Sequence, residues 1–234
     1  MKRDTLNAIK FRGITSSVLA ICTYLIIWVC CEFLHGITMS GFFAAAAAIV
    51  AVIFTSMIFK LSATKMISDI SASKVFSAYR AMFFAYVIYA ALLGAMLFYS
   101  LNYIGLDIWD YALQQNDSSF EGAFYCAMGA LYAGLKHLSE IGKSQIIALW
   151  STANIMLALI VLWKRVATLY LLGKASGSKI FYICAVITLI WGALPKLLEI
   201  FQVDKSWYGS APARYAALTV ILLSEILELI AWIR

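Results

Sequence analysis

Long apolar runs separated by short polar stretches make up most of the chain. A helix needs about 20 apolar residues to cross ~30 Å of hydrocarbon, because each residue rises ~1.5 Å and every backbone amide must be satisfied within the helix. Five runs meet this length, and a sixth is apolar apart from two glutamates. The predicted spans are residues 14–34, 41–59, 81–101, 146–163, 180–200 and 215–232. The pattern therefore predicts an all-α, polytopic membrane helix bundle.

Composition supports a lipid environment and a single unit. Hydrophobic residues make up 64% of the chain and charged residues 13%, against typical soluble values of ~45–50% and ~25%. With two prolines in 234 residues and no Ser/Gly-rich linker, we expect one integral membrane domain over residues 1–234. The net charge of +6 comes from short basic clusters between apolar runs. We therefore expect the lipid bilayer as the main partner and no direct nucleic-acid binding.

A further apolar stretch, residues 120–135, is too short for a comfortable crossing. If it does not cross, the positive-inside rule is obeyed, because most of the 18 basic residues fall on the cytoplasmic side. If it crossed, the cluster at residues 164–179 would move outside. We therefore predict six spans with both termini cytoplasmic, a half-membrane helix at 120–135 that is either re-entrant or on the outer surface, and location in a bacterial inner (plasma) membrane.

The cytoplasmic stretch Lys60–Arg80 carries serines and threonines between basic residues and contains no helix breaker. It is expected to continue as helix below the membrane. Together with the basic loop after the fourth span, it could contact a soluble cytosolic protein, or it could be a solvated connector. The candidate partner-facing residues are Lys60, Lys65, Lys74, Arg80, Lys164 and Arg165.

The segment from Ser118 to Arg165 has a distinctive order of elements. A polar, acidic entry leads into a short aromatic-rich helix, SFEGAFYCAMGAL, which is followed by a polar stretch and a long span. Over about 45 residues this order resembles the pore helix and inner helix of tetrameric cation channels of the potassium-channel type. The matching residues are Ser119, Ala123, Phe124, Tyr125 and Leu131, with Gly142 and Lys143 entering the next span. The resemblance implies a homo-oligomer with a central pore.

The filter of such channels, a TVGYG-like run that supplies rings of backbone carbonyls, is absent. In its place the chain has Tyr132, Gly134, Lys136 and His137. Four lysines around a fourfold axis would repel cations, so an anion path, a weakly selective path or a closed scaffold is expected instead of potassium selectivity. The alternative is that 120–135 is a surface helix that caps the outer face of the bundle.

Two pairs of charged residues lie within the predicted spans. Glu225 and Glu228 are three residues apart on one helix face, and a carboxylate at that depth should face a cavity, a partner or a base and not lipid. They could bind a cation or carry protons, or simply be satisfied by neighbours. Lys196 and Glu199, which follow Pro195 at the same spacing, are expected to form a local ion pair.

No motif supports a catalytic role, a cofactor or a metal. The five cysteines, Cys22, Cys30, Cys31, Cys126 and Cys184, lack CxxC spacing. The two histidines, His35 and His137, fall on different predicted outer loops, and no phosphate-binding loop, dinucleotide fingerprint or HExxH run occurs. The chain is therefore not expected to be an enzyme.

Three functions fit these features. The first is a homo-oligomeric membrane pore or channel-like protein. The second is a non-transporting anchoring or sensing subunit of a bacterial defence, immunity or secretion assembly that holds a cytosolic partner. The third is a permease subunit driven by a separate ATPase, for which a chain of this size with six spans is suitable.

Overall fold

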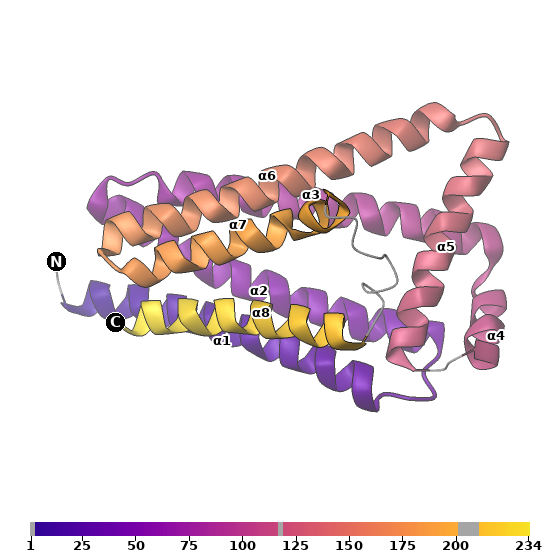
Figure 1. Cartoon of the computed structure of the whole chain (residues 1–234), viewed down its shortest axis with the longest axis horizontal. Helices are drawn as coiled ribbons and strands as arrows, with labels where there is room; N and C mark the ends of the chain where they lie inside the picture. The colour runs from indigo at the N-terminus through magenta and orange to yellow at the C-terminus, as the bar shows by residue number, and fades with distance from the viewer. Residues whose placement is uncertain (1–2, 117–118, 201–210) are drawn as a thin grey trace. The chain divides into compact units, whose positions relative to one another are not determined.

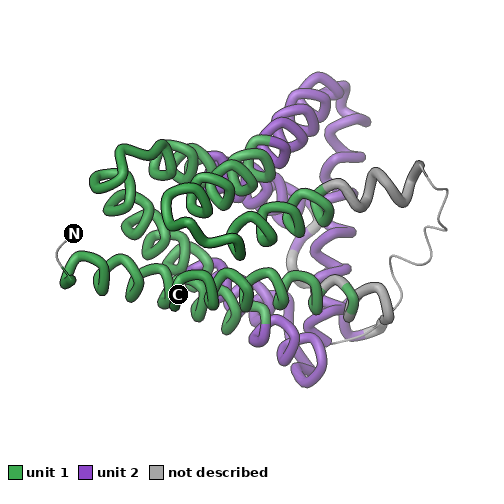
Figure 2. The backbone as a smooth tube through the Cα atoms, turned by 60° about the vertical axis from the view of Figure 1, so that its left-hand side comes forward, with its two compact units in different colours: residues 1–24, 52–84, 160–234 green, residues 25–51, 85–159 purple. Residues whose placement is uncertain are grey.

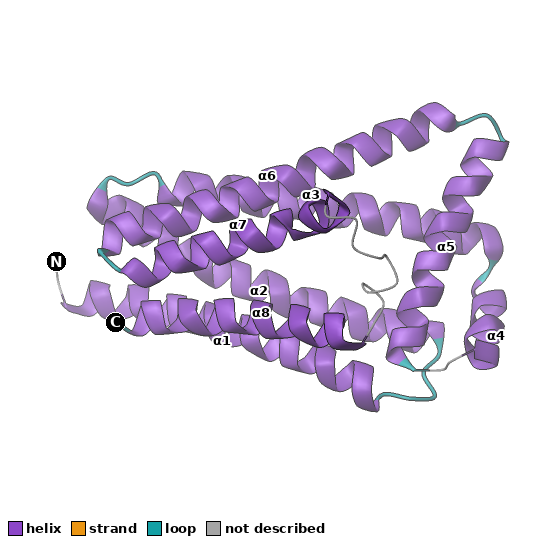
Figure 3. Ribbon diagram, viewed as in Figure 1, coloured by secondary structure: helices purple, strands orange, loops and turns teal. Residues whose placement is uncertain are grey.

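The computed structural model of the chain (Figure 1) describes residues 3–116, 119–200 and 211–234. Only the helical backbone is described for residues 104, 106, 107, 115, 116, 193–200, 211–215 and 217. The described residues form helices and no strand (Figure 3), which confirms the predicted all-α class. The helices are α1 (Arg3–Phe33), α2 (Met39–Ser71), α3 (Val75–Ile104), α4 (Leu106–Asn116), α5 (Phe120–Glu140), α6 (Ser144–Ser176), α7 (Lys179–Ile200) and α8 (Ala211–Ile233).

Four of these helices, α1, α2, α3 and α6, are long and apolar enough to cross a membrane. They carry many exposed apolar side chains, for example Phe98 at 71% and Leu149 at 73% exposure. Exposure of this kind on long helices is typical of a lipid-facing surface. These helices indicate an integral membrane protein. The described apolar part of α7, Lys179–Gly192, is shorter, so the fifth and sixth crossings stay predictions.

The stretch Lys60–Arg80 contains a break that the sequence analysis did not predict. Helix α2 continues past Lys60 as expected but ends at Ser71, and α3 begins at Val75. Ala72 between them has a φ of 50°, which lies in the left-handed region that L-residues rarely adopt. The Ser68 hydroxyl accepts a 2.9 Å hydrogen bond from the amide of Phe76 and so caps the start of α3. A side-chain cap, and not a Gly or Pro, makes this turn.

The chain divides into two compact units, which Figure 2 shows in different colours. Unit 1 comprises residues 1–24, 52–84 and 160–234, and unit 2 comprises residues 25–51 and 85–159. Because α1, α2, α3 and α6 each contribute residues to both units, neither unit is a continuous segment of sequence. The predicted single domain is not tested by this division.

The core of unit 1 draws on six helices. Its buried residues come from α1, α2, α3, α6, α7 and α8, and they are Ile9, Ala63, Val75, Leu169, Leu172, Phe181, Cys184, Ala185, Ala231 and Trp232. Within this unit α7 and α8 lie side by side. The Trp232 ring packs edge to face on Phe181, with ring centroids 5.4 Å apart. The same indole covers Gly13, where a Cβ would overlap the ring, so α8 approaches α1 closely through a glycine.

The core of unit 2 is built around α5. Phe120, Ala123 and Ala127 of α5 pack with Leu113 of α4 and Met39 and Phe42 of α2. Helix α4, which lies between the predicted third span and α5, lies along α5. Asp110 of α4 accepts a 2.6 Å hydrogen bond from the backbone amide of Met39, which places a carboxylate at the positive N-terminus of α2.

Helix α5 begins at the predicted residue but runs five residues further than expected, to Glu140. Ser119 caps its start by accepting a 3.0 Å hydrogen bond from the amide of Gly122. Gly142, with a φ of 74°, then turns the chain, and the amide of Lys143 donates to the carbonyl of Leu138 at 2.8 Å. In Figure 1, α5 runs transverse to the unit 2 part of α3. The choice between a re-entrant helix and a surface helix stays a prediction.

Candidate functional site: a paired-charge cluster within unit 1

Glu225 and Glu228 of α8 are both buried, at 4% and 1% exposure. Their spacing of three residues places them on one face of α8, as the sequence analysis predicts. Carboxylates buried in an apolar bundle are stable only when basic or hydrogen-bonding groups meet them. Each of the two glutamates has such a group, supplied by a different helix.

Arg165 of α6 meets Glu225. Its Nη2 atom lies 2.5 Å from Oε1 of Glu225 and donates a hydrogen bond to it. The Arg165 side chain is 34% exposed, whereas the Glu225 side chain is only 5% exposed. The arginine therefore extends from the outside of α6 to neutralise a carboxylate that water barely reaches.

Lys60 of α2 forms an ion pair with Glu228 of α8. The indole Nε1 of Trp232 donates a 3.2 Å hydrogen bond to the same carboxylate oxygen, Oε1, one helical turn along α8. The side chains of Lys60 and Glu228 are 13% and 2% exposed. The pair is thus more deeply buried than that of Arg165 and Glu225.

The four charges form one neutral group, which we call the paired-charge cluster: Lys60, Arg165, Glu225 and Glu228. Tyr79 of α3 is buried close enough to interact electrostatically with both glutamates and with Arg165. Cys184 of α7, which points at the backbone carbonyl of Ser224, also lies within electrostatic range of the cluster. Side chains from α2, α3, α6, α7 and α8 therefore converge on one polar centre in unit 1.

Pairing determines what this cluster can do. Each carboxylate already has a cation as partner, so neither is an open site for a further cation. The described residues contain no group of three or more His, Cys, Asp or Glu that could hold a metal ion. Removing one member of a buried pair leaves an uncompensated charge, which is strongly destabilising. The arrangement is therefore suited to hold α2, α6 and α8 in one register.

The structure separates the four residues predicted for the outer hairpin into two faces of α5. Tyr132 and Lys136, four residues apart, are exposed, and Lys136 lies 3.9 Å from Glu140 in an exposed i,i+4 pair. Gly134 is buried against Ser100 of α3, where a Cβ would overlap the serine side chain. His137 stacks on Tyr103 of α3, with ring centroids 3.6 Å apart. The four therefore do not share one exposed face of α5.

The basic residues predicted to face a cytosolic partner differ in their exposure and contacts. Lys60 and Arg165, expected to face a cytosolic partner, instead turn toward the buried glutamates. Lys65, Lys74 and Arg80 are exposed and Lys164 is half-buried. The Arg80 guanidinium lies 5.5 Å from the centroid of the Phe76 ring. The side chains of Lys196 and Glu199 lie outside the described residues.

A second polar contact, between α1 and α2 in unit 1, was not foreseen. Ser56 donates a 2.8 Å hydrogen bond to the backbone carbonyl of Ser16, and both serines are buried. One turn or more away, Arg12 donates to the hydroxyl of Ser62 and to the sulfur of Met66. The sequence feature that could have predicted this contact is the presence of serines within two apolar spans, because small hydroxyl residues often form hydrogen bonds between membrane helices.

Comparison of the chain with models of protein families, with curated proteins and with solved structures gives no significant match.

Proposed function

We propose that this chain is the subunit of a homo-oligomeric membrane pore in which neighbouring subunits meet through α5. The observation that carries the proposal is a row of exposed side chains at helical spacing: Tyr125, Met128, Tyr132 and Lys136. The opposite face of α5 is buried, with Ala123, Ala127, Ala130, Gly134 and Leu138 packed inward. An aromatic row of this kind on an otherwise packed helix favours a protein contact.

The proposal includes six crossings, with both ends of the chain on the cytoplasmic side of a bacterial inner membrane. Lys10 near the start of α1 donates 2.9 and 3.0 Å hydrogen bonds to the carbonyls of Ile233 and Arg234, which supports placing the start of α1 and the end of α8 on one side. In this topology most of the 18 basic residues fall in the cytoplasmic segments of the sequence. That distribution agrees with the positive-inside rule.

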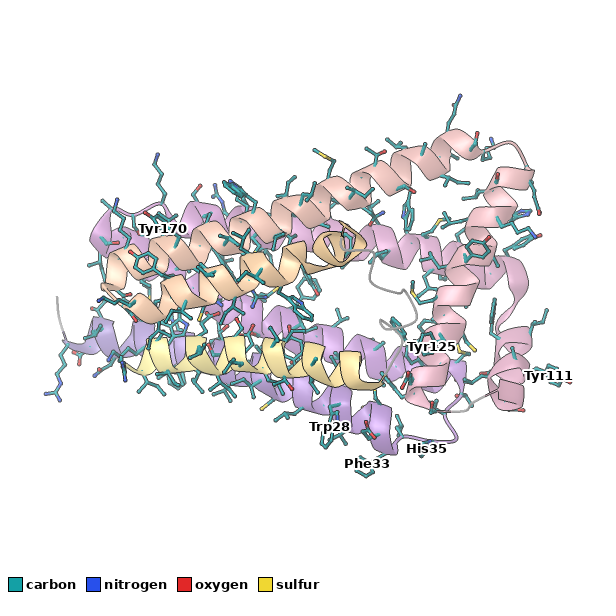
Figure 4. The ribbon with its side chains drawn as sticks, in the orientation of Figure 1. Trp28, Phe33, His35, Tyr111, Tyr125 and Tyr170 are labelled. Atoms are coloured by element: carbon teal, nitrogen blue, oxygen red, sulfur yellow. The ribbon has the colours of Figure 1, made fainter. Side chains whose placement is uncertain are left out.

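Unit 2 carries exposed aromatic side chains of the kind that is found at a membrane interface. Tyr111 of α4 and Trp28 and Phe33 of α1 project from the ribbon in Figure 4, and Tyr111 and Phe33 are 65% and 70% exposed. Trp28 and Phe33 meet edge to face, with ring centroids 6.3 Å apart. Aromatic rings are enriched at headgroup level on both sides of a membrane, which supports an interfacial position for these residues.

In this proposal the paired-charge cluster holds α2, α6 and α8 together and does not line the pore. Both glutamates are neutralised within the subunit, so neither offers a free charge to a passing ion. Selectivity would arise at the oligomer axis, where the exposed row of α5 presents Lys136 in a loose, exposed pair with Glu140. A ring of lysines attracts anions. We therefore propose an anion-preferring or weakly selective pore.

Flux from liposomes tests the proposal. Purified protein is reconstituted in a version without its five native cysteines, and chloride, potassium and carboxyfluorescein release are measured. Flux is expected, and a cationic thiol reagent should reduce it several-fold in Tyr132→Cys. The matched control is Leu149→Cys, an equally exposed residue on α6, which the reagent should leave unaffected. Absence of flux, or equal inhibition of both variants, would reject the pore.

A non-transporting anchoring subunit is the second candidate, and a different observation favours it. Lys65, Lys74 and Arg80 are exposed around the α2–α3 turn, and Lys174 and Lys179 are exposed around the α6–α7 turn. Such a basic surface suits a cytosolic partner with an acidic face. Without flux, loss of one co-purifying partner in Lys65→Glu/Lys74→Glu, but not in Lys143→Glu, would support this function.

A further inference from the structure

A cavity of about 360 Å³ lies in unit 1, at the end of the bundle that carries Lys10 and the last residues of α8. Five helices contribute to it, which makes it a pocket between elements and not a groove on one surface. This volume falls within the ~300–1,000 Å³ of small-molecule sites. The lining residues are Leu6, Ile9, Lys10, Ile67, Ile70, Ser71, Leu172, Ala175, Ser176, Ser178, Phe181, Ala231, Trp232 and Arg234.

The inner wall of this cavity is apolar and rigid. Ile9, Leu172 and Phe181 are buried members of the unit 1 core. Trp232 is fixed by its contact with Phe181 and by its hydrogen bond to Glu228. Leu6 and Ile70, which are 38% and 47% exposed, stand where the cavity opens. A hydrocarbon chain entering here would meet apolar side chains along its length.

The rim carries hydroxyl and cationic groups. Lys10 is held there by its hydrogen bonds to the carbonyls of Ile233 and Arg234. The Ser176 hydroxyl donates 2.7 Å to the carbonyl of Leu172 and accepts from the amide of Ser178. Arg234 adds a second cation, and the described lining residues include no Asp or Glu. The charge of the rim is complementary to an anion.

We infer that this cavity binds an anionic phospholipid, with one acyl chain between the helices and the headgroup at Lys10 and Arg234. Basic pockets between spans at the cytoplasmic membrane surface are suited to anionic headgroups. The volume accommodates one acyl chain in part. The inference rests on the proposed cytoplasmic position of the start of α1 and the end of α8 and is independent of conduction.

Native mass spectrometry of the full chain in detergent tests this inference. The protein is titrated with phosphatidylglycerol, phosphatidylcholine and oleate. One phosphatidylglycerol should bind with at least tenfold preference over phosphatidylcholine. Ala175→Trp, which fills the cavity, should abolish this binding, whereas Ala158→Trp, at an exposed position of the same helix, should retain it. Equal binding of the two phospholipids, or equal binding by both variants, would overturn the inference.

A charge-matched pair of variants tests the headgroup contact separately. Lys10→Gln should reduce the preference for phosphatidylglycerol several-fold, whereas Lys174→Gln, an exposed lysine of α6 that does not line the cavity, should leave it unchanged. Binding of oleate in preference to phosphatidylglycerol would overturn the assignment to a phospholipid. Because no step measures flux, failure here is distinguishable from failure of the proposed pore.

Discussion

Arg165 on α6 donates a 2.5 Å hydrogen bond to Glu225 on α8, sixty residues later in the chain. The contact joins two helices that α7 separates in sequence, and it removes the need for water at a carboxylate that is 4% exposed. Removing either partner of such a pair is strongly destabilising, because the other charge is then left buried without a partner.

Arg165→Leu should therefore destabilise the protein by about 3 kcal/mol, near the lower end of the range for a broken buried pair, since Arg165 is one-third exposed. The double variant Arg165→Leu/Glu225→Leu should recover most of this loss, because no unpaired charge remains. Thermal unfolding in detergent, followed by tryptophan fluorescence, measures both. The control is Lys136→Ala in the exposed pair with Glu140, which should cost about 0.5 kcal/mol or less. An additive double variant would contradict the pairing.

Exchanging the charges of Lys60 and Glu228 tests the second ion pair. Lys60→Glu places two carboxylates side by side in a buried site, so little folded protein is expected by size-exclusion chromatography in detergent. Lys60→Glu/Glu228→Lys should restore part of the folded fraction. Restoration remains incomplete because the Trp232 indole, which donates to Glu228, would then face an ammonium. No recovery at all would indicate that Lys60 and Glu228 do not meet.

The need of Glu225 and Glu228 for partners followed from the sequence, but the partners' identity did not. A buried carboxylate demands a counter-charge wherever it lies. Which basic residue pairs with each glutamate depends on how α2 and α6 pack on α8. No local sequence pattern predicts that packing. Lys60 and Arg165 lie at the polar ends of apolar runs, where a basic residue most often points outward. Their inward contacts emerge only from the tertiary arrangement.

The centres of the spans were predictable and their ends were not. Apolar runs identify the membrane-depth portions of α1, α2, α3 and α6, but helices continue into polar sequence wherever side chains satisfy the backbone. Ser71, for example, ends α2 with its hydroxyl bonded to the carbonyl of Ile67. Helix α4 was missed because its 11 residues are too few for a membrane crossing, and it is stabilised by burial of Leu113 and part of Trp109 in the core of unit 2.

Glycine substitutions test the close helix contacts within each unit. Gly13→Ala and Gly134→Ala should each destabilise the protein by about 1–3 kcal/mol, because the new Cβ overlaps Trp232 in the first case and Ser100 in the second. Gly94→Ala is the matched control within a helix, since nothing lies within 4 Å of its added Cβ. It should be neutral or stabilise by about 0.5–1 kcal/mol through helix propensity. Comparable losses in all three variants would contradict the contacts.

Cysteine labelling from each side of the membrane tests the proposed topology. Lys143 and Lys174 are both exposed, at the start and near the end of the α6 region, so single cysteines there report on whether α6 crosses. In the cysteine-free background, a membrane-impermeant maleimide added to intact cells should label Lys143→Cys. It should reach Lys174→Cys only after permeabilisation, because the surrounding basic residues hold that end in the cytoplasm.

Two controls make the labelling result decisive. Asp69→Cys, at an exposed position of α2 on the same predicted side, should behave like Lys174→Cys. Ala63→Cys, at a buried position in the unit 1 core, should resist the reagent from both sides until the protein is denatured. Labelling of Lys143 and Lys174 from one side would mean that α6 does not cross. Labelling of Lys174 alone in intact cells would place the α6–α7 turn outside, which would remove the basis for both the proposed topology of the pore and a cytoplasmic lipid site.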